Sequence, residues 1–392
     1  MMSFDEALRA VTGLASTVGA ETVTLYEAHG RVLAEPVVAR FAAPAVAVSA
    51  MDGYAVREED LSAGETPLRI VGESFPGKGF EGDLPQGCSV RIFTGAPTPQ
   101  GADRVIVQEE VRRSGSTIFV HGPPTGRRHV RAAGSDFAAG AVLIEVGAVL
   151  SPLCMVVLAG ADVSQVSVVR QPRLRLIATG DEIREPGVGA GGVPDSVSLG
   201  VAALARQWGA VVVSQDRCHD DIAALEQIAS QALNGADIVV VTGGASVGEH
   251  DFARAMFASS GLSLSVDKVA MKPAKPFWIG QARGAVVVGL PGNPTSALVA
   301  ARLLLAPLIA EMSGRGAGSA CEWRCELLAS DLDRGGDRET FVRAARSVAG
   351  VSPIDNQDAA AQAALARCDV LIRRDPDDPP KAAGQPVRIL EF

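Results

Sequence analysis

The stretch from Ala236 to Asp251, ADIVVVTGGASVGEHD, constrains the fold of this chain more than any other. It begins with β-branched residues from Ile238 to Val241, a pattern typical of a strand buried on both faces of a parallel sheet. Three glycines follow Thr242, and they permit a tight turn in which backbone N–H groups can approach a ligand. Such turns bind anionic ligands in α/β folds. An ordinary strand-to-helix connection has the same pattern, so this turn alone favours a ligand site only modestly.

The surrounding segment, 173–312, alternates strand-like and helix-like stretches, which predicts a doubly wound α/β domain. Strands are expected at 174–179, 210–215, 237–242, 264–270, 277–280 and 285–290, and helices at 196–207, 220–233, 250–259 and 294–312. Three turns follow the ends of these strands, and we expect them to converge on one crevice: TGDE at 179–182, the glycine turn at 243–248, and LPGNP at 290–294. Pro294 suits the first turn of a helix.

The composition of the 392-residue chain limits its class and location. Its formal net charge of −9 argues against a general nucleic-acid binder, whose affinity depends on a basic face. The six cysteines form no CxxC pair and have no zinc spacing, which favours free thiols and a reducing cytoplasm. The longest apolar stretches carry Glu145 or Arg302, so no membrane span is expected. The first residues start an amphipathic helix, expected over 3–18, in which Ser3 and Glu6 form a capping box.

Changes of pattern along the chain predict a multidomain α/β protein. Short alternating strands with frequent Gly and Pro, between about 68 and 120, indicate a small β-rich domain. The flanks of this region are each too small to fold alone, which predicts that it is an insertion. We therefore expect a split domain (1–40 with 140–172), the β-rich insertion (41–139), the α/β domain (173–318) and a barrel-like C-terminal β domain (319–392).

Two sets of charged side chains are candidates for chemistry. Lys268, Lys272 and Lys275 lie close together in an acidic chain, beside prolines that stiffen the backbone. Lysines on a solvated edge are the plain alternative, but a phosphate or oxyanion site bordering the crevice is the better interpretation. Carboxylates in turns would be suited to Mg²⁺, which prefers oxygen ligands; they are Asp52, Asp136, Glu182, Asp220 and Asp251. Each of these acids taken singly has an ordinary structural explanation.

The motifs, in this order, closely resemble the molybdopterin molybdenumtransferase family, of the MoeA and gephyrin E-domain type. The resemblance spans nearly the whole chain. Its matching motifs are SAMDGYA (49–55), FTGAPTP (93–99), ATGDEI (178–183), the Asp220-Asp221 pair, GGASVGEHD (243–251), KVAMKPAKP (268–276), GLPGNPTSA (289–297) and RETFVRA (338–344). Relatives that only bind or adenylylate molybdopterin share fewer of them, and the 49–55 and 93–99 motifs favour the transferase.

The resemblance implies four domains and a homodimer whose cleft lies between the α/β domain of one subunit and the β-rich insertion of the other. It implies that molybdate and adenylylated molybdopterin react, with a divalent metal such as Mg²⁺, to place molybdenum on the dithiolene and release AMP. It also implies an upstream molybdopterin adenylyltransferase and molybdoenzymes as protein partners. Neither nucleic acid nor a membrane is an expected partner.

The resemblance also implies catalytic, metal-binding and substrate-binding roles for individual residues. The expected catalytic groups are Asp52, Asp136, Glu182, Asp220, Asp251, Lys268 and Lys272, and the expected metal ligands are Glu182, Asp220 and Asp251. The expected substrate-binding residues are Thr94, Gly95, Thr179, Gly180, Gly243, Gly244, Ser246, Gly248, Lys275, Pro291, Gly292, Asn293, Pro294, Ser296 and Arg343. Two positions depart from the family pattern. Val197 stands where an Asn is usual, and a small Gly/Ser-rich turn reads Asp355-Asn356-Gln357-Asp358.

Two other function classes remain open from the sequence. One is a molybdopterin-binding paralogue or scaffold with weak or no transferase activity, and the other is a related molybdopterin adenylyltransferase. Release of AMP that requires molybdate would distinguish the transferase from both.

Overall fold

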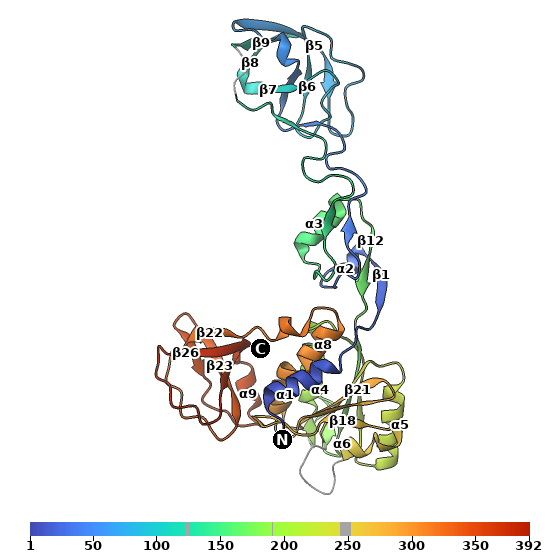
Figure 1. The fold of residues 1–392 in the computed structure, drawn as a ribbon, viewed down its shortest axis with the longest axis vertical. Coiled ribbons are helices and arrows are strands. Elements are labelled where there is room, and N and C mark those ends of the chain that lie inside the picture. Colours follow the sequence, from blue (N-terminus) through green and yellow to red (C-terminus); the bar gives the residue numbers. More distant parts are fainter. Residues whose placement is uncertain (123–125, 190, 244–251) are drawn as a thin grey trace. The chain divides into compact units, whose positions relative to one another are not determined.

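A computed structural model of the chain describes all residues except 123–125, 190 and 244–251 (Figure 1). The chain forms two compact units. The larger unit comprises Met1–Ala34, Gly147–Ser151 and Ser167–Phe392, and the smaller unit comprises Glu35–Val146 and Pro152–Val166. The finer division into four domains stays a prediction.

A six-stranded mixed sheet organises the larger unit, with strand order β16-β13-β17-β21-β20-β18. The first four strands are parallel, and β20 and β18 continue the sheet antiparallel. The strands are β13 Arg173–Thr179, β16 Val211–Cys218, β17 Ile238–Thr242, β18 Ser263–Val266, β20 Trp278–Ala282 and β21 Ala285–Leu290. All residues of β17 and β21 are buried, as the runs of β-branched residues predict.

Alternate side chains of these strands fill two separate cores, as the period of two along a strand requires. Val240 and Val288 join the core that also holds α1, α4, α7 and α8, whereas Val239 and Val287 join the core that holds α5 and α6. The helices are α1 Phe4–Gly13, α4 Ser196–Gln207, α5 Ile222–Leu233, α6 Phe252–Ala255, α7 Pro294–Ala300 and α8 Ala306–Met312. The predicted doubly wound arrangement is therefore present, with an antiparallel extension.

The long helical stretch from Pro294 to Met312 contains a π-helical turn, Ala301–Leu305, between α7 and α8. Pro307 lies two residues after the end of this turn, and its missing N–H cannot complete a regular α-helical ladder. This stretch is long and apolar enough to cross a membrane, but 89% of its apolar window is buried inside the protein. It is the core helix of the larger unit.

The first helix keeps the predicted capping box, because Glu6 N–H donates to Ser3 Oγ and Ser3 N–H donates to the Glu6 carboxylate. It ends at Gly13 rather than at residue 18. A glycine in that position costs helix stability and favours a helix end. The smaller elements on either side of the insertion are β1 Ala20–Thr24, α2 Leu25–Ala28 and β12 Gln165–Val169, and β1 pairs with β12.

A second sheet in the larger unit contains the C-terminal strands in the order β19-β23-β25-β26-β22, with β24 paired to β23. Its elements are β19 Met271–Lys272, β22 Arg324–Leu327, β23 Glu339–Ser347, β24 Gly350–Pro353, β25 Val370–Arg374, β26 Pro386–Glu391 and the short helix α9 Gln362–Leu365. The strand predicted at 264–270 ends at Val266, and Met271–Lys272 instead pairs with β23 in parallel. The lysine segment thus belongs to the edge of the C-terminal sheet.

The smaller unit is built on another six-stranded sheet, with order β7-β4-β6-β5-β9-β8. Its strands are β4 Gly53–Val56, β5 Glu65–Ser74, β6 Cys88–Ile92, β7 Arg104–Val107, β8 Val111–Ser114 and β9 Thr117–His121. Short pairs join β2 Val37–Val38 with β11 Val142–Ile144, and β3 Val48–Ser49 with β10 Val130–Arg131. Helix α3, Pro152–Gly160, also belongs to this unit. The predicted β-rich region is therefore a sheet of its own.

The remaining short segments are one-turn helices and a minor strand pair. They are the 3-10 helices Glu58–Asp60, Gln108–Glu110, Ala258–Ser260 and Ala317–Ala320, and the parallel pair of β14 Ile183–Arg184 with β15 Val193–Pro194.

Candidate functional site

The carboxyl ends of β13, β17 and β21 lie side by side. Ala178 is opposite Thr242 in one ladder, and Thr242 is opposite Leu290 in the next. A cavity of about 550 Å³ opens at this edge. Its lining includes Thr179, Glu182, Thr242, Gly243, Pro291, Gly292, Asn293 and Pro294, together with Asp195, Val197, Pro276, Ala360 and Gln362. The structure thus brings residues of the first and third predicted turns to one crevice together with Gly243, the described residue of the glycine turn, at the place where α/β sheets bind ligands.

In the floor of the crevice, the backbone segments of neighbouring turns pack directly against each other. Gly243 has a φ of +94°, and a Cβ atom built on it would lie 2.4 Å from the Thr179 carbonyl oxygen. A Cβ atom on Gly292 would lie 3.5 Å from the Gly243 Cα. Only glycine fits at position 243, since both the conformation and the space exclude a side chain. This contact sets the separation of the first two turns.

Carboxylates gather around the first of these turns. Glu182 lines the crevice, and a Cβ atom built on Gly180 would lie 2.8 Å from Glu182 Oε2. At the end of the neighbouring strand β16, the Asp220 N–H donates to Asp181 Oδ1 at 3.1 Å, and His219 Nδ1 is 3.2 Å from the same oxygen. The structure therefore places the backbone of Asp220 beside the TGDE turn.

Asp195 contributes a buried carboxylate to the crevice, with 5% of its surface exposed. Its Oδ1 accepts from the Ser198 N–H at 3.0 Å and caps α4, while Arg217 lies 3.7 Å from its Oδ2. Val197, one of the two departures from the family pattern, is 7% exposed and belongs to the core beneath the crevice. This wall of the crevice is therefore apolar where an amide was expected.

The three lysines do not line the crevice, contrary to the expectation that their segment borders it with its charges. Lys272 lines a second cavity of about 570 Å³ with Arg334, Thr340 and Gln357. Lys268 lines a third cavity, of about 540 Å³, with the N-terminal methionines. The physical reason is the pairing of β19 with β23, which carries Lys272 to the C-terminal sheet, so that Pro276 alone of this segment reaches the crevice.

Arg343, on β23, is almost fully buried, with 1% of its surface exposed. Its guanidinium donates to the carbonyl oxygens of Asn356 and Asp358 at 3.3 and 3.1 Å, and the Gln357 amide oxygen accepts from its backbone N–H at 3.0 Å. Burial lowers the pKa of Arg343, while its Nη1 has no hydrogen-bond partner among the described residues. The turn that departs from the family pattern therefore holds this arginine.

In the smaller unit, the predicted residues Asp52 and Thr94 lie together. The Thr94 N–H and hydroxyl both donate to Asp52 Oδ1, at 2.7 and 2.8 Å. These two hydrogen bonds lower the pKa of Asp52, because they stabilise its ionised form. Gly95 follows with a φ of +82°, and Asp136 lies in another turn, where its N–H donates to the Ala43 carbonyl oxygen at 3.0 Å.

Comparison with known proteins decides the family. Residues 2–161 match the MoeA N-terminal region (domain I and II), and residues 175–311 match the probable molybdopterin binding domain. The molybdopterin molybdenumtransferase of Haemophilus influenzae is 38% identical over 298 residues, which cover 75% of this chain and 73% of that protein. The molybdopterin molybdenumtransferase of a Nostoc species is 34% identical over 85% of this chain and 78% of its own length. The chain belongs to the molybdopterin molybdenumtransferase family.

The fold agrees with this family. A crystal structure of the molybdopterin biosynthesis MoeA protein of Pyrococcus horikoshii matches with a TM-score of 0.85 and 27% identity, over all of this chain and 99% of that one. The family predicted from the motifs, the multidomain α/β fold and the enzyme class are confirmed.

The crevice also contains residues that the sequence did not indicate. Ala360 and Gln362 line it from the segment before and within α9, more than 60 residues after the last predicted turn. The Thr295 hydroxyl donates to the Ala359 carbonyl oxygen, which ties this segment to the first turn of α7. No local pattern around Ala360 marks it as a site residue. Four predicted residues, Gly244, Ser246, Gly248 and Asp251, lie outside the described residues.

Proposed function

We propose that this chain transfers molybdenum from molybdate to adenylylated molybdopterin, with release of AMP. The crevice at the carboxyl ends of β13, β17 and β21 is the observation that carries this proposal. It combines a glycine-built floor, which suits a phosphate-bearing ligand, with carboxylates at one side. The membership of the chain in the molybdopterin molybdenumtransferase family supplies the substrate class.

We assign the phosphoanhydride and the adenylyl group of the substrate to the crevice. Thr179, Gly180, Gly243, Gly292 and Asn293 would contact them through backbone groups and short side chains. Pro291, Pro294 and Ser296 would shape the wall at the start of α7, while Gly244, Ser246 and Gly248 would extend the glycine turn. Backbone N–H groups suit an anion because they supply positive partial charge without a side chain that must be ordered.

A divalent cation such as Mg²⁺ would be held by Glu182 and Asp220, with Asp251 as the third proposed ligand. Glu182 belongs to the TGDE turn, and the backbone of Asp220 is hydrogen-bonded to that turn. Their carboxylates offer oxygen ligands, which fits a hard cation. No group of three candidate ligands occurs among the residues that the structure describes. Such a cation supplies charge that offsets the negative charge of the phosphoanhydride.

The oxyanion of molybdate requires positive side chains. Lys268, Lys272 and Lys275 remain our candidates, and Lys272 is the best supported because its cavity also contains Arg334. Arg343 would act next to this cavity through the backbone of β23 and the 355–358 turn that it holds. Asp52, Thr94, Gly95 and Asp136 are proposed to complete the cleft from the smaller unit of a partner subunit.

We further propose that the chain is a cytoplasmic homodimer that receives its substrate from a molybdopterin adenylyltransferase and serves molybdoenzymes. The free cysteines agree with a reducing compartment. Helix α3 supports the dimer, since Leu158 is its only buried residue although all nine of its residues are apolar or small.

The test is AMP release from adenylylated molybdopterin in the presence of Mg²⁺ and molybdate. We expect release that depends on molybdate, and we expect Glu182→Gln to lower its rate at least about 10-fold, because the variant loses a negative oxygen donor. Glu322→Gln is the matched control, since this exposed carboxylate pairs with Arg324 and neither residue lines the crevice. Release without molybdate would mean that water cleaves the phosphoanhydride and that no molybdenum transfer is coupled to it. Binding without release would favour a binding paralogue or an adenylyltransferase, whose reaction forms this anhydride.

A further inference from the structure

Four side chains of the smaller unit form a continuous stack that ends at the surface. The Arg91 guanidinium carbon lies 5.1 Å from the Tyr54 ring centroid and 4.8 Å from the Phe93 ring centroid. The Phe93 ring stacks on Phe75, with centroids 4.8 Å apart and an angle of 13° between the rings. Tyr54 is 4% exposed, whereas Phe75 is 41% exposed. The stack thus leads from a buried ring to an open one.

The open ring is held in place by its surroundings. The Phe75 N–H donates to the Lys78 carbonyl oxygen at 2.9 Å, and the Lys78 N–H donates to the Phe75 carbonyl oxygen at 3.0 Å. The preceding Ser74 hydroxyl donates to the Pro97 carbonyl oxygen at 2.7 Å. Later in the loop, the Phe80 ring covers Gly72, where a Cβ atom would lie 2.6 Å from the ring. A ligand that stacks on Phe75 would therefore meet a preformed surface.

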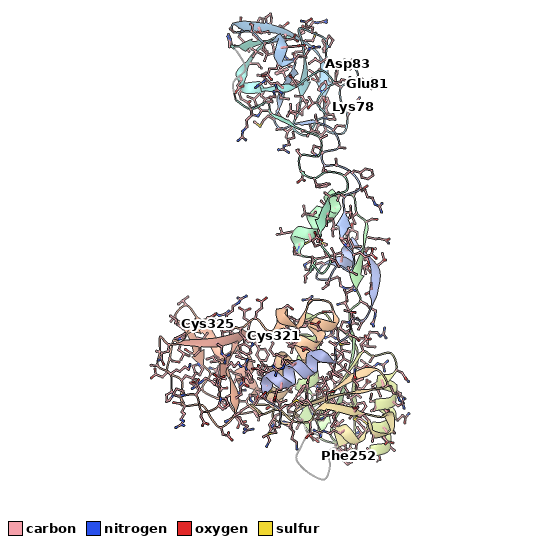
Figure 2. The ribbon with its side chains drawn as sticks, in the orientation of Figure 1. Lys78, Glu81, Asp83, Phe252, Cys321 and Cys325 are labelled. Atoms are coloured by element: carbon pink, nitrogen blue, oxygen red, sulfur yellow. The ribbon has the colours of Figure 1, made fainter. Side chains whose placement is uncertain are left out.

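The loop that follows Phe75 in the sequence carries three charged side chains. Figure 2 shows Lys78, Glu81 and Asp83 along one edge of the smaller unit. All three are exposed, and none forms an ion pair with any described residue. Lys78 is the sole lysine before Lys268 in the sequence. An ammonium group beside an open aromatic ring suits a planar ring that carries a phosphate.

The carboxylates of Glu81 and Asp83 would favour planar rings that present two adjacent N–H donors. A carboxylate accepts two adjacent N–H donors side by side. A pterin presents such a pair, the ring N–H and the neighbouring amino group, whereas the adenine edge presents a donor next to an acceptor. Glu81 and Asp83 therefore favour the pterin.

We propose that the exposed face of Phe75 is a stacking platform for the pterin ring of a phosphorylated pterin ligand, with Lys78 facing its phosphate and Glu81 or Asp83 its N–H edge. This inference rests on the proposed function for the identity of the ligand, and it extends that function by assigning recognition of the pterin to the β-rich unit. The surrounding positions are close to Thr94 in sequence, since Phe93 precedes it.

The test is calorimetric titration of the full chain with a 6-substituted pterin monophosphate and, separately, with AMP. We expect Phe75→Ala to raise the Kd for the pterin about 10-fold, because stacking on an aromatic ring contributes about 1–3 kcal/mol per base. Phe75→Leu should lose as much, since it keeps apolar area without a ring, and Phe75→Trp should bind at least as well as the natural chain. Phe41→Ala is the matched control, because Phe41 is an exposed phenylalanine of the same unit, 62% exposed.

Several outcomes would contradict the proposal that Phe75 is a stacking platform. They are no pterin binding by the natural chain, unchanged binding in Phe75→Ala, full binding in Phe75→Leu, or a loss confined to AMP. The proposed function fails separately. If AMP release never depends on molybdate while Phe75→Ala still weakens pterin binding, the transferase reaction is wrong and the platform stands.

Discussion

Thr94 keeps Asp52 ionised by two hydrogen bonds from a single residue; Thr94 is exposed and Asp52 is half-buried. The backbone N–H of Thr94 has the larger effect on the pKa of Asp52, and its hydroxyl adds to it. The pKa of Asp52 therefore lies below its ordinary value of 3.8. A carboxylate with a lowered pKa stabilises the folded state at neutral pH, and this contribution is lost as the pH falls through the folded pKa.

We expect Thr94→Val to raise the pKa of Asp52 part of the way to its ordinary value, because the variant loses the hydroxyl and keeps the backbone N–H. The carboxyl carbon shift of Asp52, followed by NMR from neutral to acid pH, measures this change. Thr98→Val is the matched control: the Thr98 hydroxyl is buried without a hydrogen-bond partner among the described residues. An unchanged Asp52 titration in Thr94→Val would show that the hydroxyl contributes nothing to the pKa.

At the scale of elements, the start of α7 is where the two sheets of the larger unit meet near the crevice. Thr295 is fully buried, and its N–H donates to the Ala359 carbonyl oxygen at 3.3 Å. Its hydroxyl also faces the Asp358 carbonyl oxygen at 3.3 Å. Because Arg343 donates to the same Asp358 oxygen, this segment is fixed by helix α7 on one side and by strand β23 on the other. The position of Gln362 in the crevice depends on these contacts.

We expect Thr295→Val to lower the free energy of unfolding of the larger unit by about 1 kcal/mol, the usual net contribution of one hydrogen bond. The volume of the side chain is conserved, and both carbonyl oxygens keep another donor. Urea unfolding followed by tryptophan fluorescence measures this loss, since Trp208, Trp278 and Trp323 all lie in the larger unit.

Thr12→Val is the control for this prediction, because the Thr12 hydroxyl donates only to carbonyl oxygens of its own helix. AMP release should also slow in Thr295→Val, as the wall formed by Ala360 loosens. Equal unfolding curves for the two valine variants would mean that the hydrogen bond from the Thr295 hydroxyl to the Ala359 carbonyl oxygen does not stabilise the larger unit.

Elements with a strong local pattern were predictable from the sequence. The apolar runs located β13, β17 and β21 to within one residue, and the turn residues placed Thr179, Gly243 and Gly292 at one edge of a sheet. The pairing of Lys272 with β23 was not predictable, because two residues of strand have no periodicity and their partner is about 70 residues away. The position of Gln362 in the crevice was not predictable for the same reason, because only tertiary contacts place it there.

At the scale of the whole molecule, the exposed apolar side chains of α3 are the strongest indication of self-association. Leu153 and Val156 are 79% and 72% exposed, and Val157 beside them is 37% exposed. Exposed apolar residues are common singly, but a helix that leaves most of its apolar surface in water is typical of an interface. A charged residue placed there would have to be desolvated when two copies associate, which is costly.

We therefore expect the natural chain to elute with twice the monomer mass of 40.4 kDa in size-exclusion chromatography with light scattering, and the double variant Leu153→Asp, Val156→Asp to elute as a monomer. Val348→Asp is the control, because Val348 is fully exposed in the turn between β23 and β24 and should leave the mass unchanged. The monomeric variant should also lose AMP release while it keeps the pterin binding that depends on Phe75, since the cleft that we propose is formed by two subunits and the proposed platform by one. A double variant that stays dimeric would remove α3 from the interface, and an active monomer would show that one subunit contains the complete site.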